Sequence, residues 1–123
     1  MKNLVLQQTD ETPYLDFHKD GHLLIKGISI PENISKFYTE PIHWLNEFKA
    51  HKPHKIYLVF QIEYINTSST RVFIDIIRLV DSFKDDKTQV EVVWAHEEDD
   101  EDNIELGEEL QFSSKVKFTF KTK

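Results

Sequence analysis

The chain of 123 residues has no cysteine, and it contains only three glycines and four prolines. Without thiols it cannot form disulfides, a thiolate zinc site or a cysteine nucleophile. No glycine-rich or proline-rich linker divides it, so we expect one domain over residues 1–123. No apolar run approaches the roughly 18 residues that cross a bilayer, and the amino-terminal run is too short for a signal peptide. We therefore expect a cytoplasmic protein without membrane insertion.

Basic residues are absent from one segment. The net charge is −7, and residues 97–109 hold nine acids and no Lys or Arg, whereas the rest of the chain is nearly neutral. A negative protein is a poor match for nucleic acid, whose phosphates are bound by basic surfaces. We expect a solvated acidic turn that favours the positive end of the next helix. The alternative, a docking surface for a basic partner, would consist of Glu97, Glu98, Asp99 and Asp100.

Alternating apolar residues predict strands. Tyr14–Phe17 and His22–Ile28 flank an Asp-Gly pair, which is typical of a hairpin, and Leu4–Gln7 is a short edge strand. The clearest strand is Lys55–Ile65. Its first half is apolar on both faces, so we expect a central strand covered on both sides. Two further strands are expected at Val90, Val92 and Trp94 and at Val116, Phe118 and Phe120.

An apolar stripe at helical spacing over residues 34–48 predicts the first helix, with Asn33 as its N-cap. Pro41 lies inside this stripe and lacks a backbone donor. It predicts a kink, or a restart of the helix capped by Thr39.

Two more helices are expected, one with its apolar stripe over residues 72–83 and a short acidic one over about Asn103–Leu110. The order is a hairpin followed by three strand–helix–strand steps. Helical crossovers of this length join parallel strands. The sequence therefore predicts an α/β fold with a small, mixed, mostly parallel sheet, an N-terminal hairpin and about three helices.

The polar segment 66–70, Asn-Thr-Ser-Ser-Thr, joins the clearest strand to the second helix. Its side chains can accept hydrogen bonds from the free amides at a helix start, and spacing alone is explained most simply by such capping. Partners and ligands also bind at the carboxyl ends of parallel strands. A phosphate there would face the positive end of the helix dipole and add about −1.5 to −2 charges without breaking the fold.

Motifs over nearly the whole chain resemble the SiaC-type regulatory phosphoproteins, a bacterial family whose fold is similar to the anti-sigma-factor antagonists (the STAS fold). The matching stretches, in order, are Thr12-Pro13, Gly27-Ile28-Ser29-Ile30-Pro31-Glu32-Asn33, Pro41-Ile42-His43-Trp44-Leu45, Tyr64-Ile65-Asn66-Thr67-Ser68-Ser69, Leu106-Gly107-Glu108-Glu109 and Phe118-Thr119-Phe120. Their order and spacing carry the resemblance, which implies a single STAS-like regulatory domain.

The resemblance also implies which residue is modified. In the family the phosphorylated hydroxyl directly follows the Asn, which here makes it Thr67. The antagonists usually carry Asp-Ser-Ser where this chain has Asn-Thr-Ser-Ser, so Ser68 and Ser69 remain the next candidates. Tyr64, Asn66, Ser68 and Ser69 would shape the turn and contact partners.

The implied function is that of a non-enzymatic, partner-switching phosphoprotein without a cofactor. Its implied partners are a protein kinase, a metal-dependent serine/threonine phosphatase and a diguanylate cyclase. The unphosphorylated form would bind and activate the cyclase, which would place the chain in cyclic-di-GMP signalling and biofilm regulation.

A small-molecule or metal-binding module that uses the strand ends and the acidic segment is the second hypothesis. The six histidines form no His-Glu-x-x-His pattern, and the acids lack the spacing and glycine of a calcium loop. We therefore expect no metal site. A hydrolase has little support, because no base lies beside Ser68 or Ser69 in the sequence and no Gly-x-Ser-x-Gly motif occurs.

Overall fold

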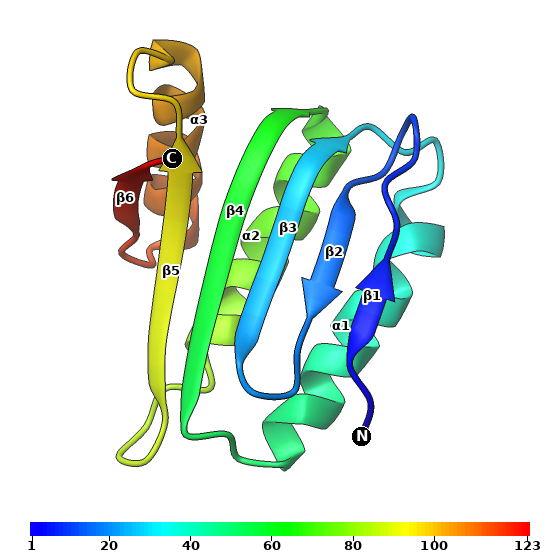
Figure 1. Ribbon diagram of the computed structural model, residues 1–123, viewed down its shortest axis with the longest axis vertical. Coiled ribbons are helices and arrows are strands. Elements are labelled where there is room, and N and C mark those ends of the chain that lie inside the picture. Colours follow the sequence, from blue (N-terminus) through cyan, green and yellow to red (C-terminus); the bar gives the residue numbers. More distant parts are fainter.

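The computed structural model describes all 123 residues as a six-stranded sheet with three helices (Figure 1). The strands lie in the sheet in their order along the chain. The second strand is antiparallel to both the first and the third, and the last three continue the sheet parallel to the third. The strands are β1 (Leu4–Leu6), β2 (Tyr14–Phe17), β3 (His22–Ser29), β4 (Lys55–Ile65), β5 (Gln89–His96) and β6 (Thr119–Thr122). The predicted hairpin and mixed, mostly parallel sheet are confirmed.

All three helices cover the same face of the sheet (Figure 1). They are α1 (Ile34–Ala50), α2 (Thr67–Asp81) and α3 (Glu101–Ser114), and each connects two neighbouring parallel strands. Crossovers of one hand that always move to the next strand in the same direction place their helices on one face.

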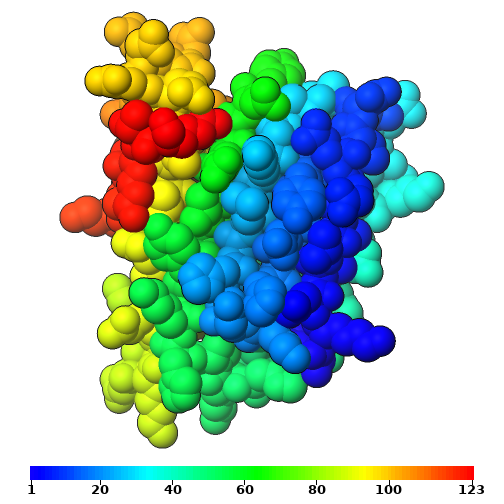
Figure 2. All heavy atoms as spheres, in the orientation of Figure 1, coloured from blue at the N-terminus to red at the C-terminus, as the bar shows by residue number.

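The other face of the sheet carries no helix, and Figure 2 shows the side chains of β2 to β4 there without any covering element. On this face Tyr57 and Val59 of β4 are only half-buried. The prediction that β4 is covered on both sides is therefore wrong. On the opposite face, Ile56, Leu58 and Phe60 are fully buried against the helices, and burial of such side chains contributes about 1.5–3 kcal/mol each.

The first helix is continuous. Asn33 caps it as predicted, because its side chain accepts a hydrogen bond from the backbone N–H of Lys36 at 3.1 Å. The hydroxyl of Thr39 donates to the carbonyl of Ser35 at 2.6 Å, within the same helix. The prediction of a restart capped by Thr39 is therefore wrong, and the helix passes through Pro41.

Helix α3 lies close to β5 because residue 107 is glycine. A Cβ at this position would lie 2.6 Å from the indole ring of Trp94, which is closer than any real contact. The indole N–H of Trp94 donates to the backbone carbonyl and the side-chain oxygen of Asn103, each at 3.0 Å. Trp94 and Asn103 are both buried, so this pair fixes the start of α3 on the sheet.

Helix α2 is joined to the end of α3 by Arg78. Its guanidinium donates to the carbonyl of Ser113 at 2.9 Å and to that of Ser114 at 3.3 Å. These are carbonyls of the last turn of α3, which has no basic residue of its own. Arg78 therefore caps the carboxyl end of the neighbouring helix.

The carboxyl-terminal elements differ in their bounds from the prediction. Helix α3 begins at Glu101, not Asn103, and continues to Ser114. Val116 and Phe118 are buried as expected, but they precede β6, which begins at Thr119. The N–H of Phe118 donates to the side chain of Gln111 at 2.7 Å instead of to a neighbouring strand.

Candidate functional site

The segment that joins β4 to α2 forms a capped turn. The side-chain oxygen of Asn66, Oδ1, accepts the backbone N–H of Ser69 at 3.0 Å and the hydroxyl of Ser68 at 3.2 Å. The N–H of Asn66 donates in turn to the carbonyl of Ser29 at 3.1 Å, at the end of β3. Asn66 is therefore the N-cap of α2, and the turn is fixed to the neighbouring strand.

Three buried hydroxyls lie beneath this turn. The Ser69 hydroxyl donates to the Ser29 carbonyl at 2.9 Å and lies 2.7 Å from the Ser29 hydroxyl, which lies 2.5 Å from the Tyr38 hydroxyl. The Ser69 hydroxyl has one proton, which it donates to the carbonyl. The Ser29 hydroxyl must therefore donate to the Ser69 oxygen, and the Tyr38 hydroxyl must donate to the Ser29 oxygen. This hydroxyl chain connects α1, β3 and α2.

The chain of hydroxyls is closed to solvent. Ser29 and Ser69 are both 0% exposed, and Tyr38 is 1% exposed. Burial raises the pKa of the Tyr38 phenol well above its ordinary value, against a smaller opposing effect of its hydrogen bond to Ser29. No polar side-chain atom of this group is left without a partner, so the chain is a structural anchor of the turn.

The predicted turn residues divide into exposed and buried. Thr67 and Ser68 are exposed, Asn66 is half-buried, and Tyr64 at the end of β4 is 61% exposed. Thr67 is the first residue of α2, and its hydroxyl takes part in none of the side-chain hydrogen bonds of the turn. A modifying enzyme can therefore reach Thr67 and Ser68 in the folded protein, whereas Ser69 would have to leave the hydroxyl chain first.

Electrostatics at the start of α2 favour an anion. The first turn of α2 contains no acidic residue. Backbone N–H groups that lack intrahelical partners, together with the helix dipole, leave a partial positive charge there. A phosphate on Thr67 would lie at this positive end and meet no neighbouring carboxylate of the same turn.

The acidic turn between β5 and α3 lies at the same end of the sheet. Glu97, Glu98, Asp99 and Asp100 are all exposed, and Asp100 also caps α3 by accepting the N–H of Asn103 at 3.1 Å. As expected, this segment is a solvated turn that favours the positive end of the next helix.

Asn103 also connects the acidic turn to β4. Its side chain donates to the carbonyl of Ile62, at 2.5 Å, a few residues before the Thr67 turn. The two predicted surfaces, the hydroxyl turn and the acidic turn, therefore lie at the ends of adjacent strands.

Sequence reasoning missed Ser29 and Tyr38 as parts of this site. It placed Tyr38 in the apolar stripe of the first helix, where its ring does lie, against Phe73 at 6.1 Å between ring centroids. A signal for the buried role of Ser69 was present. Ser69 lies four residues before Phe73, in phase with the buried face of α2, whereas Thr67 is out of phase.

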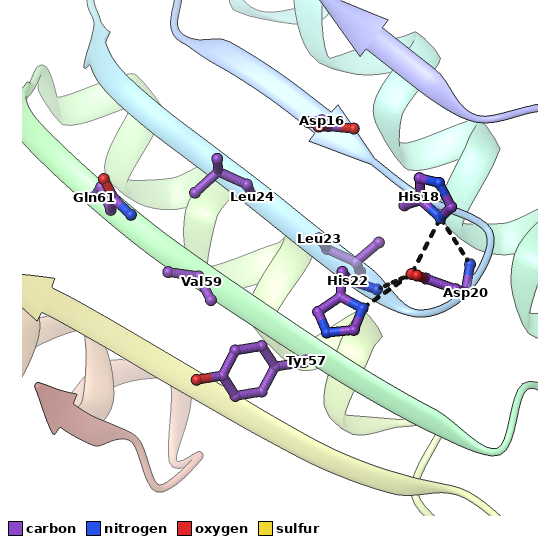
Figure 3. Close-up of a pocket in the computed structure, with 9 residues that line it drawn as sticks. All are labelled: Asp16, His18, Asp20, His22, Leu23, Leu24, Tyr57, Val59 and Gln61. Atoms are coloured by element: carbon purple, nitrogen blue, oxygen red, sulfur yellow. Dashed lines mark hydrogen bonds and ion pairs between the residues drawn. The ribbon is translucent and has the colours of Figure 1, made fainter.

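A hollow of about 370 Å³ lies on the uncovered face of the sheet, next to the β2–β3 turn (Figure 3). There Asp20 lies between two histidines, with its Oδ1 3.1 Å from Nδ1 of His18 and 3.0 Å from Nδ1 of His22. The backbone N–H of His22 contributes most to holding the pKa of Asp20 below its ordinary value. This hollow lies by the amino ends of β3 and β4, at the other end of these strands from Thr67.

No group of three or more His, Cys, Asp or Glu side chains is arranged to hold a metal ion. None of the three helices has the length and apolar character needed to cross a bilayer.

Known proteins are similar to this chain in fold and in sequence. An uncharacterized protein of Pseudomonas aeruginosa strain UCBPP-PA14 is 29% identical over 112 residues, covering 90% of this chain and 89% of that protein. A solved structure of SiaC of Pseudomonas aeruginosa matches with a TM-score of 0.84 at 27% identity, over 100% of this chain and 98% of that one.

A second solved structure is that of the diguanylate cyclase SiaD in complex with its activator SiaC, also from Pseudomonas aeruginosa. It matches with a TM-score of 0.87 at 26% identity, over 98% of this chain and 99% of that one. Residues 6–123 match the family described as SiaC family regulatory phosphoprotein. With nearly every residue covered by the match, this chain belongs to the SiaC family of regulatory phosphoproteins.

Proposed function

We propose that this chain is a non-enzymatic partner-switching protein that is reversibly phosphorylated on Thr67. The observation that carries the proposal is the difference among the three hydroxyls of the turn. Thr67 is exposed and unengaged, Ser68 is bonded to Asn66, and Ser69 is buried in the hydroxyl chain. A kinase can therefore phosphorylate the Thr67 hydroxyl without breaking a hydrogen bond of the turn.

The chemistry would come from the partners, and this chain would supply only the acceptor oxygen. A protein kinase would transfer the γ-phosphoryl group of ATP to Oγ1 of Thr67, with the hydroxyl proton passing to a base of the kinase and ADP leaving. A metal-dependent serine/threonine phosphatase would hydrolyse the ester with water, restore the hydroxyl and release inorganic phosphate. Both partners act on nucleotides or phosphoproteins of the cytoplasm, where we place the chain.

We propose that the unphosphorylated form binds and activates a diguanylate cyclase and so acts in cyclic-di-GMP signalling and biofilm regulation. The support is the likeness over 98% of this chain to the structure of SiaD with its activator SiaC. Thr67 and Tyr64 would lie in the contact, and the acids Glu97 to Asp100 would attract a basic surface of the partner. A phosphate at Thr67 would bury about two negative charges in that contact and weaken it.

Phosphopeptide mass spectrometry on protein purified from cells tests the site, with Thr67→Ala and Ser68→Ala as the matched variants. We expect phosphate on Thr67 in the parent and in Ser68→Ala, and none in Thr67→Ala. Phosphate found on Ser68 or Ser69 alone would overturn the assignment.

The effect on binding is tested by calorimetry with the diguanylate cyclase, comparing the parent with Thr67→Glu and Thr67→Val. Thr67→Glu should weaken binding about tenfold or more, because a charge is desolvated in the contact, whereas Thr67→Val should bind nearly as well. Equal binding by Thr67→Glu and the parent would contradict a switch based on charge.

A further inference from the structure

Arg71 lies one helical turn after Thr67 on the exposed side of α2. Its side chain is 82% exposed, and its Nε lies 3.7 Å from Oδ1 of Asp75, whose side chain is 52% exposed. This is a single contact near the distance limit of an ion pair, in solvent. Exposed pairs of this kind contribute at most a small part of a protein's stability. Arg71 is therefore held loosely.

The direction of this pair is also unfavourable. In a helix, an acid four residues before a base is more stable than the reverse order, because that order agrees with the helix dipole. Arg71 precedes Asp75, so the existing pair has the weaker order. A phosphate on Thr67 would be an acid four residues before Arg71, which is the stronger order.

The reach is available without moving the backbone. Side chains in a helix lean toward its amino end, so a long residue covers the turn before its own Cα. In the unmodified protein Arg71 reaches Asp75 instead, so rotation about its side-chain bonds would be needed to bring the guanidinium over the turn that holds Thr67. There its planar guanidinium could donate two parallel hydrogen bonds to phosphate oxygens.

The turn itself is not free to respond. Ser69 is anchored to the Ser29 carbonyl at 2.9 Å beneath the helix start, and Asn66 is anchored to the same carbonyl at 3.1 Å. A group added to Thr67 therefore meets a fixed backbone. Arg71, four residues further along the same helix and 82% exposed, is a cation that is free to change its partner.

We propose that phosphorylated Thr67 takes Arg71 from Asp75, so that the phosphate is held in an ion pair with Arg71 and the Asp75 carboxylate is left unpaired. This inference rests on the proposed function, because it assumes Thr67 as the acceptor. The surface then changes by more than the phosphate alone. The unphosphorylated face presents a hydroxyl and an available guanidinium, and the phosphorylated face presents a phosphate that masks Arg71 and a free carboxylate one turn further along.

The test uses full-length protein with phosphothreonine installed at position 67 by genetic code expansion, which needs no kinase. Phosphorus NMR follows the second ionisation of the phosphate, whose pKa is about 6 when unperturbed. A nearby guanidinium favours the dianion, so Arg71→Gln should raise this pKa by about half a unit. Lys84→Gln, which removes the same charge beyond the far end of α2, is the matched control and should leave the pKa unchanged.

Asp75 sharpens the test. Asp75→Asn should lower the pKa of the phosphate further, because Arg71 loses its competing partner, and this effect should vanish when Arg71→Gln is also present. The proposal is overturned if Arg71→Gln shifts the pKa no more than Lys84→Gln does. It is also overturned if Asp75→Asn acts equally with and without Arg71. Phosphopeptide mapping that places the cellular phosphate on another residue would contradict the proposed function. It would not change the titration result, which is obtained with phosphothreonine installed at position 67.

Discussion

The turns that lead into α2 and α3 have the same hydrogen-bonding frame: an N-cap side chain that binds the third residue of the helix, and a third residue whose side chain binds the sheet. In the first, the Asn66 side chain accepts the N–H of Ser69 at 3.0 Å, and in the second the Asp100 side chain accepts the N–H of Asn103 at 3.1 Å. Each accepting residue is an N-cap, and each donor is the third residue of its helix. Both third residues are buried and polar, and each donates from its side chain to a backbone carbonyl of the sheet.

The two turns differ at the first two helical positions. Thr67 and Ser68 begin α2, whereas Glu101 and Asp102 begin α3. Negative charge at a helix start is stabilising by about 0.3–1 kcal/mol. Helix α3 thus carries permanently the kind of charge that α2 would gain by phosphorylation. The comparison shows that this frame accommodates an anion at the first residue of the helix. Phosphorylation of Thr67 can therefore change the charge of the turn without changing its backbone.

The largest expected effect comes from removing the buried anchors. Asn103→Ala should lower the free energy of unfolding by about 3 kcal/mol, because the Ile62 carbonyl loses the buried Asn103 donor and the Trp94 indole keeps only one of its two acceptors, the Asn103 backbone carbonyl. Ser69→Ala should cost less, about 1.5 kcal/mol, because the Ser29 carbonyl keeps its hydrogen bond from the N–H of Asn66 and only the Ser29 hydroxyl loses an acceptor. Urea denaturation measures both changes.

Ser68→Ala is the matched control, since this exposed serine makes only the 3.2 Å bond to Asn66, and its cost should be within about 0.5 kcal/mol. Equal losses for Asn103→Ala and Ser69→Ala would show that the two frames depend equally on their anchors, against this expectation.

A smaller effect should distinguish the two frames: only the frame of α2, which contains Tyr38, should make stability depend on alkaline pH. Burial raises the pKa of Tyr38 above its ordinary value of 10.0, so the folded protein keeps the phenol proton at a pH where the unfolded chain releases it. The unfolded state then binds fewer protons, and stability falls as pH rises above the unfolded pKa. Between about pH 9 and pH 11 the loss should be about 1 kcal/mol.

Tyr38→Phe should abolish this alkaline loss while lowering stability near neutral pH by about 1 kcal/mol, through the missing bond to Ser29. Asn103→Ala should retain it, because the frame of α3 contains no phenol. Urea denaturation over a pH series provides the measurement, and an unchanged alkaline slope in Tyr38→Phe would contradict the argument.

The smallest effect should follow from exchanging the charges of the two turns. Thr67→Glu with Ser68→Asp should stabilise the protein by about 0.5 kcal/mol, and Glu101→Thr with Asp102→Ser should destabilise it by a similar amount. Both changes should shrink in about 0.5 M salt, where such interactions are screened. Thermal unfolding measures them, and changes of the same sign in both exchanges would break the comparison.

Local pattern predicted much of the fold. The alternation of Lys55–Ile65 predicted β4 with its observed bounds, and the residue before the first apolar stripe, Asn33, is the observed cap of α1. What alternation could not tell is the order of strands in the sheet. Apolar residues on both faces of β4 predicted a strand covered on both sides, but the sequential strand order places every helix on one face. The relation to the STAS fold stays a prediction.

The acidic helix and the site were harder to predict. Most exposed positions of α3 are acids, and its buried residues include Asn103 and Gly107, so an apolar stripe predicts only part of its length. At the turn, Thr67, Ser68 and Ser69 are similar in chemistry, and sequence alone ranked them only by resemblance. Their difference in exposure depends on helical phase and on two distant partners, Ser29 and Tyr38.

Helix α2 is fixed at both ends, by the Ser69 hydroxyl against β3 and by Arg78 against the last carbonyls of α3. A rod held in this way transmits little motion along its axis. A change at Thr67 therefore reaches only the side chains within contact of it, and any protein that tells the two forms apart must bind the exposed side of the first half of α2.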